Sequence, residues 1–204
     1  GDHILQIDSA NVLYEVSRSL RPYTRGTPGS KAIVKILRDG IADTLVFTLT
    51  REEIKVQNLP YFGLVQDSVG YIKLDRFSRQ SGDDVKTAIR ELRNQSNLCG
   101  IILDVRDNPG GLLDAATAIS EIFAPQGSRI VSTKGRQESE ARVYTALSRP
   151  FEPDIPLAVL INGRSASASE VLAGAIQDLD RGVIMGERSF GKGLVQNVFS
   201  LPYN

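Results

Sequence analysis

Three serines at alternate positions, Ser165, Ser167 and Ser169, stand out as residues that could do chemistry. They follow an apolar stretch and precede a segment with helical spacing, so they are expected at a helix N-terminus. The positive end of the helix dipole favours an alkoxide there, which suits Ser167 as a nucleophile. Glu170 follows Ser167 at the spacing of a capping box, however. From this segment alone, a structural role and a nucleophilic role for Ser167 are equally open.

The counts of histidine and cysteine narrow the choice of a catalytic base. The chain has one histidine, His3, and one cysteine, Cys99, which excludes an internal disulfide and a metal site built from a cysteine cluster. A Ser-His-Asp triad would have to use His3. Lys192 lies between two glycines, and a lysine in its neutral form can take the proton of a serine, although most lysines are simply solvated. The string is not a phosphate-binding loop, because Gly193 stands where Ser or Thr is required.

A third loop, 104–112, joins a nearly all-apolar segment to a helix-like one through Pro109-Gly110-Gly111. Consecutive glycines let backbone N–H groups face a ligand without obstruction by a Cβ. At a helix N-terminus such donors favour a developing negative charge, as in an oxyanion hole. A strand-to-helix turn that needs glycine only for its geometry explains the same residues. Taken alone, the loop is better explained as such a turn.

Composition indicates a globular protein and excludes several classes of function. The 204 residues include 24 Lys and Arg and 24 Asp and Glu, so the formal net charge is zero and a chain-wide basic surface for nucleic acid is absent. No apolar run approaches the roughly 18 residues that indicate a membrane span. The chain opens on polar residues, Gly1-Asp2-His3, without the pattern of a signal peptide.

Residues 1–57 are predicted to be mostly β. Strands are expected at 4–7, 31–37 and 44–50, and the last two form a hairpin. Apolar residues at 12, 13, 16 and 20 have helical spacing and predict a helix over 12–20.

From residue 68 onward, predicted strands alternate with predicted helices, which indicates an α/β layer architecture. The apolar strand 100–105 is of the type whose two faces are both covered. Residues 135–153 are polar and are expected to form a loop or an excursion. The other predicted strands are 69–74, 130–133, 156–161, 182–185 and 194–201, and the predicted helices are 83–93, 112–123 and 167–179.

Together the three loops closely resemble those of the carboxyl-terminal processing (tail-specific) proteases, family S41 of the serine peptidases. The resemblance rests on Asp-x-Arg-x-Asn-Pro-Gly-Gly at 104–111, Ser-Ala-Ser-Ala-Ser-Glu at 165–170 and Gly-Glu-x-Ser-Phe-Gly-Lys-Gly-x-Val-Gln at 186–196. Residues 1–8, Gly-Asp-His-Ile-Leu-Gln-Ile-Asp, are similar to a strand of PDZ domains.

This resemblance implies an α/β fold with a ClpP/crotonase-like protease core at 58–204, preceded by a partial, mostly β PDZ domain at 1–57. It also implies that the first PDZ strands and the last strands of the core lie outside these residues. We therefore expect residues 1–204 alone to be of low stability, because sheet edges would be exposed.

The resemblance implies a Ser-Lys dyad. Ser167 matches the nucleophile, Lys192 matches its base, and Gln196 matches the residue that orients the lysine. Because burial favours the neutral form of a lysine, apolar surroundings are expected for Lys192. The side chains expected to supply them are Phe190, Leu194 and Val195.

Further positions match by the same resemblance. The oxyanion donors are expected to be the backbone N–H groups of Ala168 and of Gly110 or Gly111. Glu170 and Asp178 match positions that are important in the family, and we expect them to support the structure.

The implied function is a serine endopeptidase that cleaves polypeptides near their C-terminus through an acyl-enzyme, with no cofactor and no metal. Its partner would be a protein or peptide substrate with a free C-terminus and not a nucleic acid; a homo-oligomer and a regulatory adaptor are left open. The family is usually exported to the bacterial periplasm or cell envelope, or to a plastid lumen. The alternative is a non-catalytic S41-like protein that binds a ligand or peptide, since one fold serves many functions.

Overall fold

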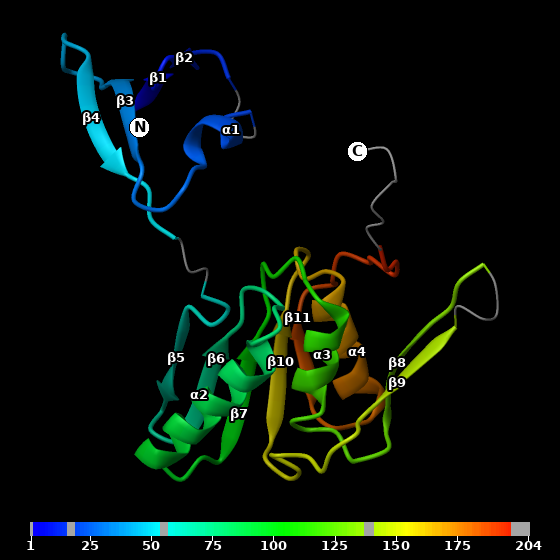
Figure 1. Ribbon diagram of the computed structural model, residues 1–204. Coiled ribbons are helices and arrows are strands. Elements are labelled where there is room, and N and C mark those ends of the chain that lie inside the picture. Colours follow the sequence, from blue (N-terminus) through cyan, green and yellow to red (C-terminus); the bar gives the residue numbers. More distant parts are fainter. Residues whose placement is uncertain (1, 16–18, 54–56, 137–140, 197–204) are drawn as a thin grey trace. The chain divides into compact units, whose positions relative to one another are not determined.

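The structure, a computed structural model, describes residues 2–15, 19–53, 57–136 and 141–196 (Figure 1). The chain divides into two compact units, Gly1–Val56 and Gln57–Asn204. The three loops that carry the candidate catalytic residues all lie in the larger unit.

The smaller unit contains an antiparallel sheet with strand order β2-β1-β3-β4 and a short helix. The predicted hairpin is confirmed: β3 and β4 pair in register from Lys31 opposite Thr50 to Ile36 opposite Leu45. The elements are β1 (His3–Ile7), β2 (Ala10–Asn11), α1 (Arg21–Thr24), β3 (Lys31–Leu37) and β4 (Leu45–Thr50).

The helix predicted over 12–20 is wrong in the part of this segment that the structure describes. Ala10 and Asn11 instead pair with β1 as strand β2. The side chain of Asn11 then accepts a hydrogen bond from the Leu13 N–H at 3.1 Å, which bends the chain into a turn. Sheet pairing and this local turn thus override the apolar spacing, and the helix α1 begins only at Arg21.

The larger unit is built on a five-stranded sheet with order β11-β10-β7-β6-β5. The four strands β6, β7, β10 and β11 run parallel, and β5 pairs with β6 in antiparallel fashion. A separate hairpin pairs β8 with β9. The elements are β5 (Tyr61–Val65), β6 (Val69–Lys73), α2 (Ser81–Gln95), β7 (Gly100–Asp104), α3 (Leu113–Ser120), β8 (Arg129–Thr133), β9 (Arg142–Thr145), β10 (Leu157–Ile161), α4 (Ala168–Asp178) and β11 (Val183–Gly186).

The helices α2, α3 and α4 lie side by side on one face of this sheet (Figure 1). Each helix connects two parallel strands, and the strand order advances in one direction from β6 to β11. Right-handed crossovers therefore place all three helices on the same face. The predicted apolar face of α2 is confirmed, since Val85, Ile89 and Leu92 are fully buried.

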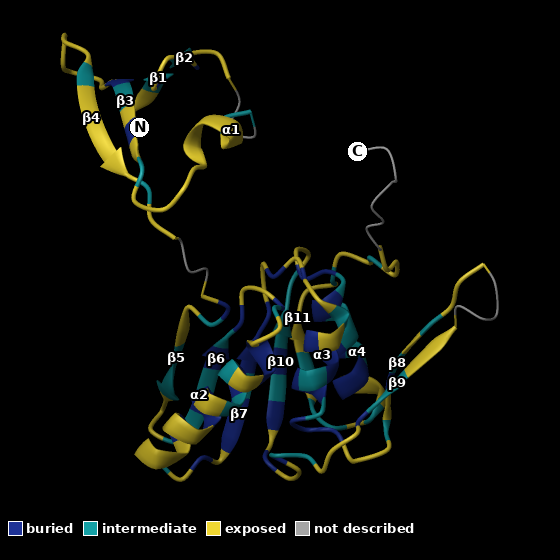
Figure 2. Cartoon of the chain, viewed as in Figure 1, coloured by how far each residue is buried: buried dark blue, intermediate teal, exposed yellow. Residues whose placement is uncertain are grey.

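Burial alternates along β6, whereas four of the five residues of β7 are buried. Figure 2 accordingly draws β7 mostly in the colour of buried residues. Ile72, Leu103 and Val159 face the helices and are fully buried, whereas Ile102 is half-buried. The other five residues of the segment 100–105 are buried, which agrees with the expectation that both faces of this strand are covered.

Three further differences from the sequence expectations concern strands. β5 was not expected, and β9 lies inside the segment 135–153, for which a loop or an excursion was expected but no strand. The strand predicted over 194–201 is wrong for 194–196, which form no regular element, and its other residues lie outside the described part of the chain. Among the described residues, no helix has the length and apolar character needed to cross a membrane.

Candidate active site

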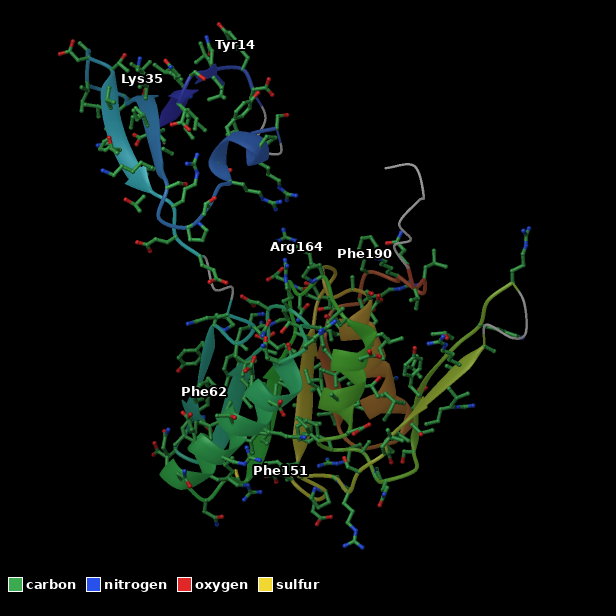
Figure 3. All side chains as sticks on the ribbon, in the orientation of Figure 1. Tyr14, Lys35, Phe62, Phe151, Arg164 and Phe190 are labelled. Atoms are coloured by element: carbon green, nitrogen blue, oxygen red, sulfur yellow. The ribbon has the colours of Figure 1, made fainter. Side chains whose placement is uncertain are left out.

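The three loops singled out in the sequence come together at one edge of the larger sheet. They follow β7, β10 and β11, and these strands are parallel, so their carboxyl ends share that edge. Arg164, from the loop after β10, and Phe190, from the loop after β11, both lie at this edge in Figure 3. Hydrogen bonds also connect the loops, as Phe190 N–H donates to Ser165 O at 3.0 Å.

The structure distinguishes the three serines by their surroundings. The Ser165 hydroxyl donates to Val105 O at 2.8 Å, and the Ser169 hydroxyl donates to Asn108 O at 2.9 Å. Both of these residues are fully buried. Ser167, between them, is half-buried. Ser165 and Ser169 therefore fasten the helix start to the neighbouring loop, and Ser167 is the one of the three serines that is partly exposed.

Ser167 has an unusual backbone conformation, with φ 58° and ψ −113°. Positive φ is uncommon for a residue with a side chain and costs about 1–3 kcal/mol. Ser167 is the residue before the first turn of α4 and occupies the N-cap position. The strain is held by bonds on both sides, because Ala166 N–H donates to Asn108 O and Ser167 N–H donates to Glu170 Oε2.

The Glu170 carboxylate holds together the segments that carry Ser167 and Lys192. Its Oε2 accepts the N–H of Ser167 at 2.7 Å and the N–H of Lys192 at 2.9 Å. Its Oε1 accepts the Ser189 hydroxyl at 2.8 Å and the Gly191 N–H at 2.7 Å. One half-buried carboxylate thus fixes the start of α4 and the loop after β11.

This environment lowers the pKa of the Glu170 carboxyl below its ordinary value. Burial alone would raise the pKa, because it disfavours the charged form. The hydrogen bonds from the Ser189 hydroxyl and from the N–H groups of Gly191, Ser167 and Lys192 favour the charged form and outweigh burial. Glu170 is therefore a carboxylate at neutral pH and acts as an acceptor for all four donors.

The glycine turn packs directly against the start of α4. Gly110 has φ 102°, and a Cβ there would lie 2.9 Å from Ala168 N and 2.9 Å from the Ser167 Cβ. Gly111 has φ 151°, and a Cβ there would lie 2.1 Å from Phe77 O. Neither position has room for a side chain. The turn therefore needs glycine for contact as well as for conformation.

The two glycine N–H groups differ in their partners. The Gly110 N–H donates to the Asn108 side-chain Oδ1 at 2.8 Å. Gly111 forms a parallel bridge with Phe77, in which Gly110 O and Leu112 N face Phe77 and the Gly111 N–H faces away from it. The structure gives the Gly111 N–H no acceptor among the described residues.

Lys192 is half-buried, and its Nζ donates to Gln196 Oε1 at 3.4 Å. The expected contact between these two side chains is therefore present. The apolar surroundings expected for Lys192 are absent among the described residues. The three side chains that were expected to cover the lysine are themselves 59% to 75% exposed. The loop that carries them is irregular and leaves them in solvent. They are Phe190, Leu194 and Val195.

Asp178 lies away from these groups. It is the last residue of α4, and Ser167 immediately precedes the first. A helix of this length separates its two ends by about 16 Å. Asp178 is exposed. The structure thus brings Glu170 into the candidate site but leaves Asp178 at the other end of the helix.

A buried acid that the sequence analysis did not single out anchors the start of the glycine-turn loop. Asp104 is 1% exposed and accepts from the Arg106 guanidinium at 2.6 Å and from the Tyr71 hydroxyl at 2.6 Å. Burial would raise the pKa of Asp104, but these bonds, the Arg106 N–H and the nearby Lys73 lower it to about 2. Asp104 and Arg106 both belong to the Asp-x-Arg-x-Asn-Pro-Gly-Gly motif at 104–111. The sequence therefore showed that both residues are present, but not that their side chains form an ion pair.

The described residues contain no group of three or more His, Cys, Asp and Glu side chains that could hold a metal ion. The arrangement offers a half-buried serine on a strained turn, a lysine whose backbone N–H shares a carboxylate acceptor with that serine, and the N–H of Gly111 in the adjoining turn. Among the described residues, the Lys192 amine bonds to Gln196 and not to the Ser167 hydroxyl. This combination can support attack of a serine on a carbonyl group.

Comparisons with known proteins agree on one family. Residues 68–204 match the model of "Peptidase family S41". A carboxy-terminal-processing protease of Bartonella bacilliformis is 37% identical over 207 residues, covering 100% of this chain and 47% of the relative. A carboxyl-terminal-processing protease of Synechocystis sp. is 40% identical over 205 residues, covering 98% of this chain and 47% of the relative.

A solved structure described as a photosystem II D1 C-terminal processing protease superposes with a TM-score of 0.64 at 31% identity. It covers 99% of this chain, and the chain covers 55% of it. A putative S41 protease from Bacteroides fragilis shares the fold, with a TM-score of 0.63 at 17% identity over 100% of this chain and 58% of that one. The chain spans about half the length of the curated relatives it matches.

Proposed function

Because the chain belongs to peptidase family S41, we propose that it carries the catalytic core of a serine endopeptidase that cleaves polypeptides near their C-terminus. Ser167 is the nucleophile and Lys192 is the general base, with Gln196 orienting the lysine. The N–H groups of Ala168 and Gly111 bind the oxyanion. We prefer Gly111 to Gly110 because the Gly110 N–H already donates to Asn108.

The proposed reaction has two stages. Neutral Lys192 Nζ accepts the hydroxyl proton of Ser167 as Oγ bonds to the scissile carbonyl carbon, and the oxyanion accepts hydrogen bonds from the turn. The protonated lysine then donates that proton to the leaving amine as the C–N bond breaks. Water next attacks the acyl ester and gives a proton to Lys192, and the serine leaves with that proton as the new C-terminus is released.

The observation that carries this proposal is the contrast among the three serines. The hydroxyls of Ser165 and Ser169 are buried and donate to backbone carbonyls, so their role is structural. Ser167 combines partial exposure with a strained backbone that is held in place by Glu170. A protein that only binds peptides gains nothing from that strain, which supports catalysis over the non-catalytic alternative.

A fluorophosphonate probe that reacts with activated serines tests the proposal in the intact protein. We expect labelling of the unaltered protein and loss of labelling in Ser167→Ala. Ser148→Ala, at an exposed serine outside the three loops, is the control and should still be labelled. Labelling that survives Ser167→Ala, or an unaltered protein that neither labels nor cleaves peptides, would overturn the assignment.

Further parts of the proposal concern the whole protein. We propose that the Gly1–Val56 unit is the C-terminal part of a PDZ domain, supported by its antiparallel sheet, and that Gln57–Asn204 forms the protease core. The substrate is a protein or peptide with a free C-terminus. We also propose an extracytoplasmic location, in the periplasm or cell envelope of a bacterium, since the relatives are bacterial and chloroplast processing proteases. Cell fractionation with an antibody against the protein tests this location.

A further inference from the structure

Asn108, in the loop after β7, is fully buried and uses both ends of its side-chain amide. Its Nδ2 donates to Leu74 O at 2.8 Å, just beyond the end of β6. Its Oδ1 accepts the Gly110 N–H at 2.8 Å. The amide therefore links the end of one strand to the glycine turn that follows the next strand.

The main chain of Asn108 extends the same connection to α4. Its carbonyl oxygen accepts the Ala166 N–H at 3.1 Å and the Ser169 hydroxyl at 2.9 Å. These two donors lie on either side of Ser167 in the sequence. Asn108 thus contacts three segments at once, which are the end of β6, the glycine turn and the helix start that carries Ser167.

The side-chain bond decides which glycine N–H is available. A donor committed to Asn108 Oδ1 is not free to bind a developing oxyanion. Gly110 is in this position, whereas the Gly111 N–H faces away from Phe77 and has no acceptor among the described residues. Asn108 thus occupies the Gly110 N–H and, by holding the turn in place, sets the direction of the Gly111 N–H.

Only an amide of this length satisfies both neighbours. An aspartate keeps the acceptor for Gly110 but, when ionised, has no donor for Leu74 O. An alanine leaves a buried N–H and a buried carbonyl without partners, each of which favours a rearranged turn. The Gly110 N–H would then be free to rotate, because glycine has few conformational barriers.

We propose that Asn108 is a positioning residue that assigns the oxyanion role to Gly111 by holding the Gly110 N–H. The inference rests on the proposed peptidase function. It adds a residue that never touches the substrate and that acts on the transition state through the turn. Its loss should weaken stabilisation of the oxyanion and leave ground-state binding of the substrate almost intact.

The test compares Asn108→Ala with Asn108→Asp in the intact protein, using a peptide substrate and a peptide boronate that bonds to the serine. For Asn108→Ala we expect kcat to fall on the order of 10²-fold with KM within about twofold, and boronate affinity to fall by a similar factor. Asn108→Asp keeps the acceptor for Gly110 and should retain kcat within about tenfold even if it lowers Tm. Asn58→Ala is the matched control, because Asn58 is a buried amide that donates to Asp84 elsewhere in the same unit.

The outcomes separate this inference from the peptidase assignment. If the unaltered protein does not cleave peptides, the proposed function fails and this inference fails with it. If the unaltered protein is active but both Asn108 variants lose activity only in proportion to their loss of Tm, as Asn58→Ala would, the positioning role is wrong. If Asn108→Ala does not fold, an Asn108→Asp variant with a kcat as low as that of Ser167→Ala also overturns it.

Discussion

The backbone N–H groups of Ser167 and Lys192 donate to the same atom, Oε2 of Glu170. The two residues therefore lie within two hydrogen-bond lengths of each other at their main chains, although a whole helix and strand separate them in the sequence. A shared acceptor fixes their spacing more tightly than two independent contacts would, since neither segment can move without weakening the bond to the other.

Replacing Glu170 with glutamine should impair catalysis more than binding. The side chain keeps its shape but loses its charge, and one of its two acceptor positions becomes an NH2 donor that faces N–H groups. We expect Glu170→Gln to lower kcat by about 10- to 100-fold with a smaller change in KM, measured by steady-state peptide cleavage. Asp178→Asn, an acid-to-amide change at the far end of α4, serves as the control and should keep its kcat.

The effect of Glu170 on stability should depend on pH. Its folded-state pKa is lowered, so its contribution is fully present above the ordinary glutamate pKa and is lost as pH falls through the folded value. The unfolding free energy of Glu170→Gln should therefore lie below that of the unaltered protein at neutral pH and approach it in acid. Urea titrations at about pH 7 and at successively lower pH measure this difference; a difference that does not change with pH would contradict it.

Ser167→Gly should stabilise the protein while abolishing its activity. Glycine adopts positive φ without the steric cost that Ser167 bears, so the unfolding free energy should rise by about 1 kcal/mol. Ser167→Ala also removes the hydroxyl but keeps a Cβ and hence the strain. Chemical denaturation of the two inactive variants compares them directly, and equal stability of the two would show that the backbone of Ser167 is not strained.

Sequence patterns predicted the family S41 fold, which the comparisons confirm, and the alternation of strands and helices from residue 69 to 185. They could not show how side chains pair. Periodicity gave no sign that Ser165 and Ser169 are committed to carbonyls 60 and 61 residues away. Asn108 carried one signal, an asparagine before Pro-Gly-Gly, which is typical of a turn whose side chain bonds to its own backbone. The apolar character of Phe190, Leu194 and Val195 led to the wrong prediction that they cover Lys192. Their exposure depends on tertiary contacts that the residue types do not show.

Asp104→Asn should destabilise the larger unit in a pH-dependent way. The pKa of Asp104 is lowered from 3.8 to about 2, so its charge stabilises the fold by about 2 kcal/mol above pH 4, and this contribution is lost as pH falls toward 2. We expect Asp104→Asn to lower Tm at neutral pH and to differ little from the unaltered protein near pH 2. Asp75→Asn is a suitable control, since Asp75 lies beside Lys73 but is half exposed.

Lys192→Ala should remove peptide cleavage and leave peptide binding largely intact, because the lysine acts on protons and not on substrate affinity. Steady-state assays of peptide cleavage and equilibrium binding of the same peptide measure the two effects separately, and a Lys192→Ala variant that still cleaves would exclude this base.

The hydrogen bonds of Asn108 reach 34 residues back to Leu74 and 61 residues forward to Ser169. Closing loops of these lengths costs conformational entropy, so we expect these bonds to form after the local contacts of the chain. A nascent or partly unfolded chain thus carries Ser167 without a turn that can receive an oxyanion. In the proposed enzyme, catalytic activity would therefore appear only once the sheet is complete. The protease would be inactive toward other polypeptides until its own chain had folded.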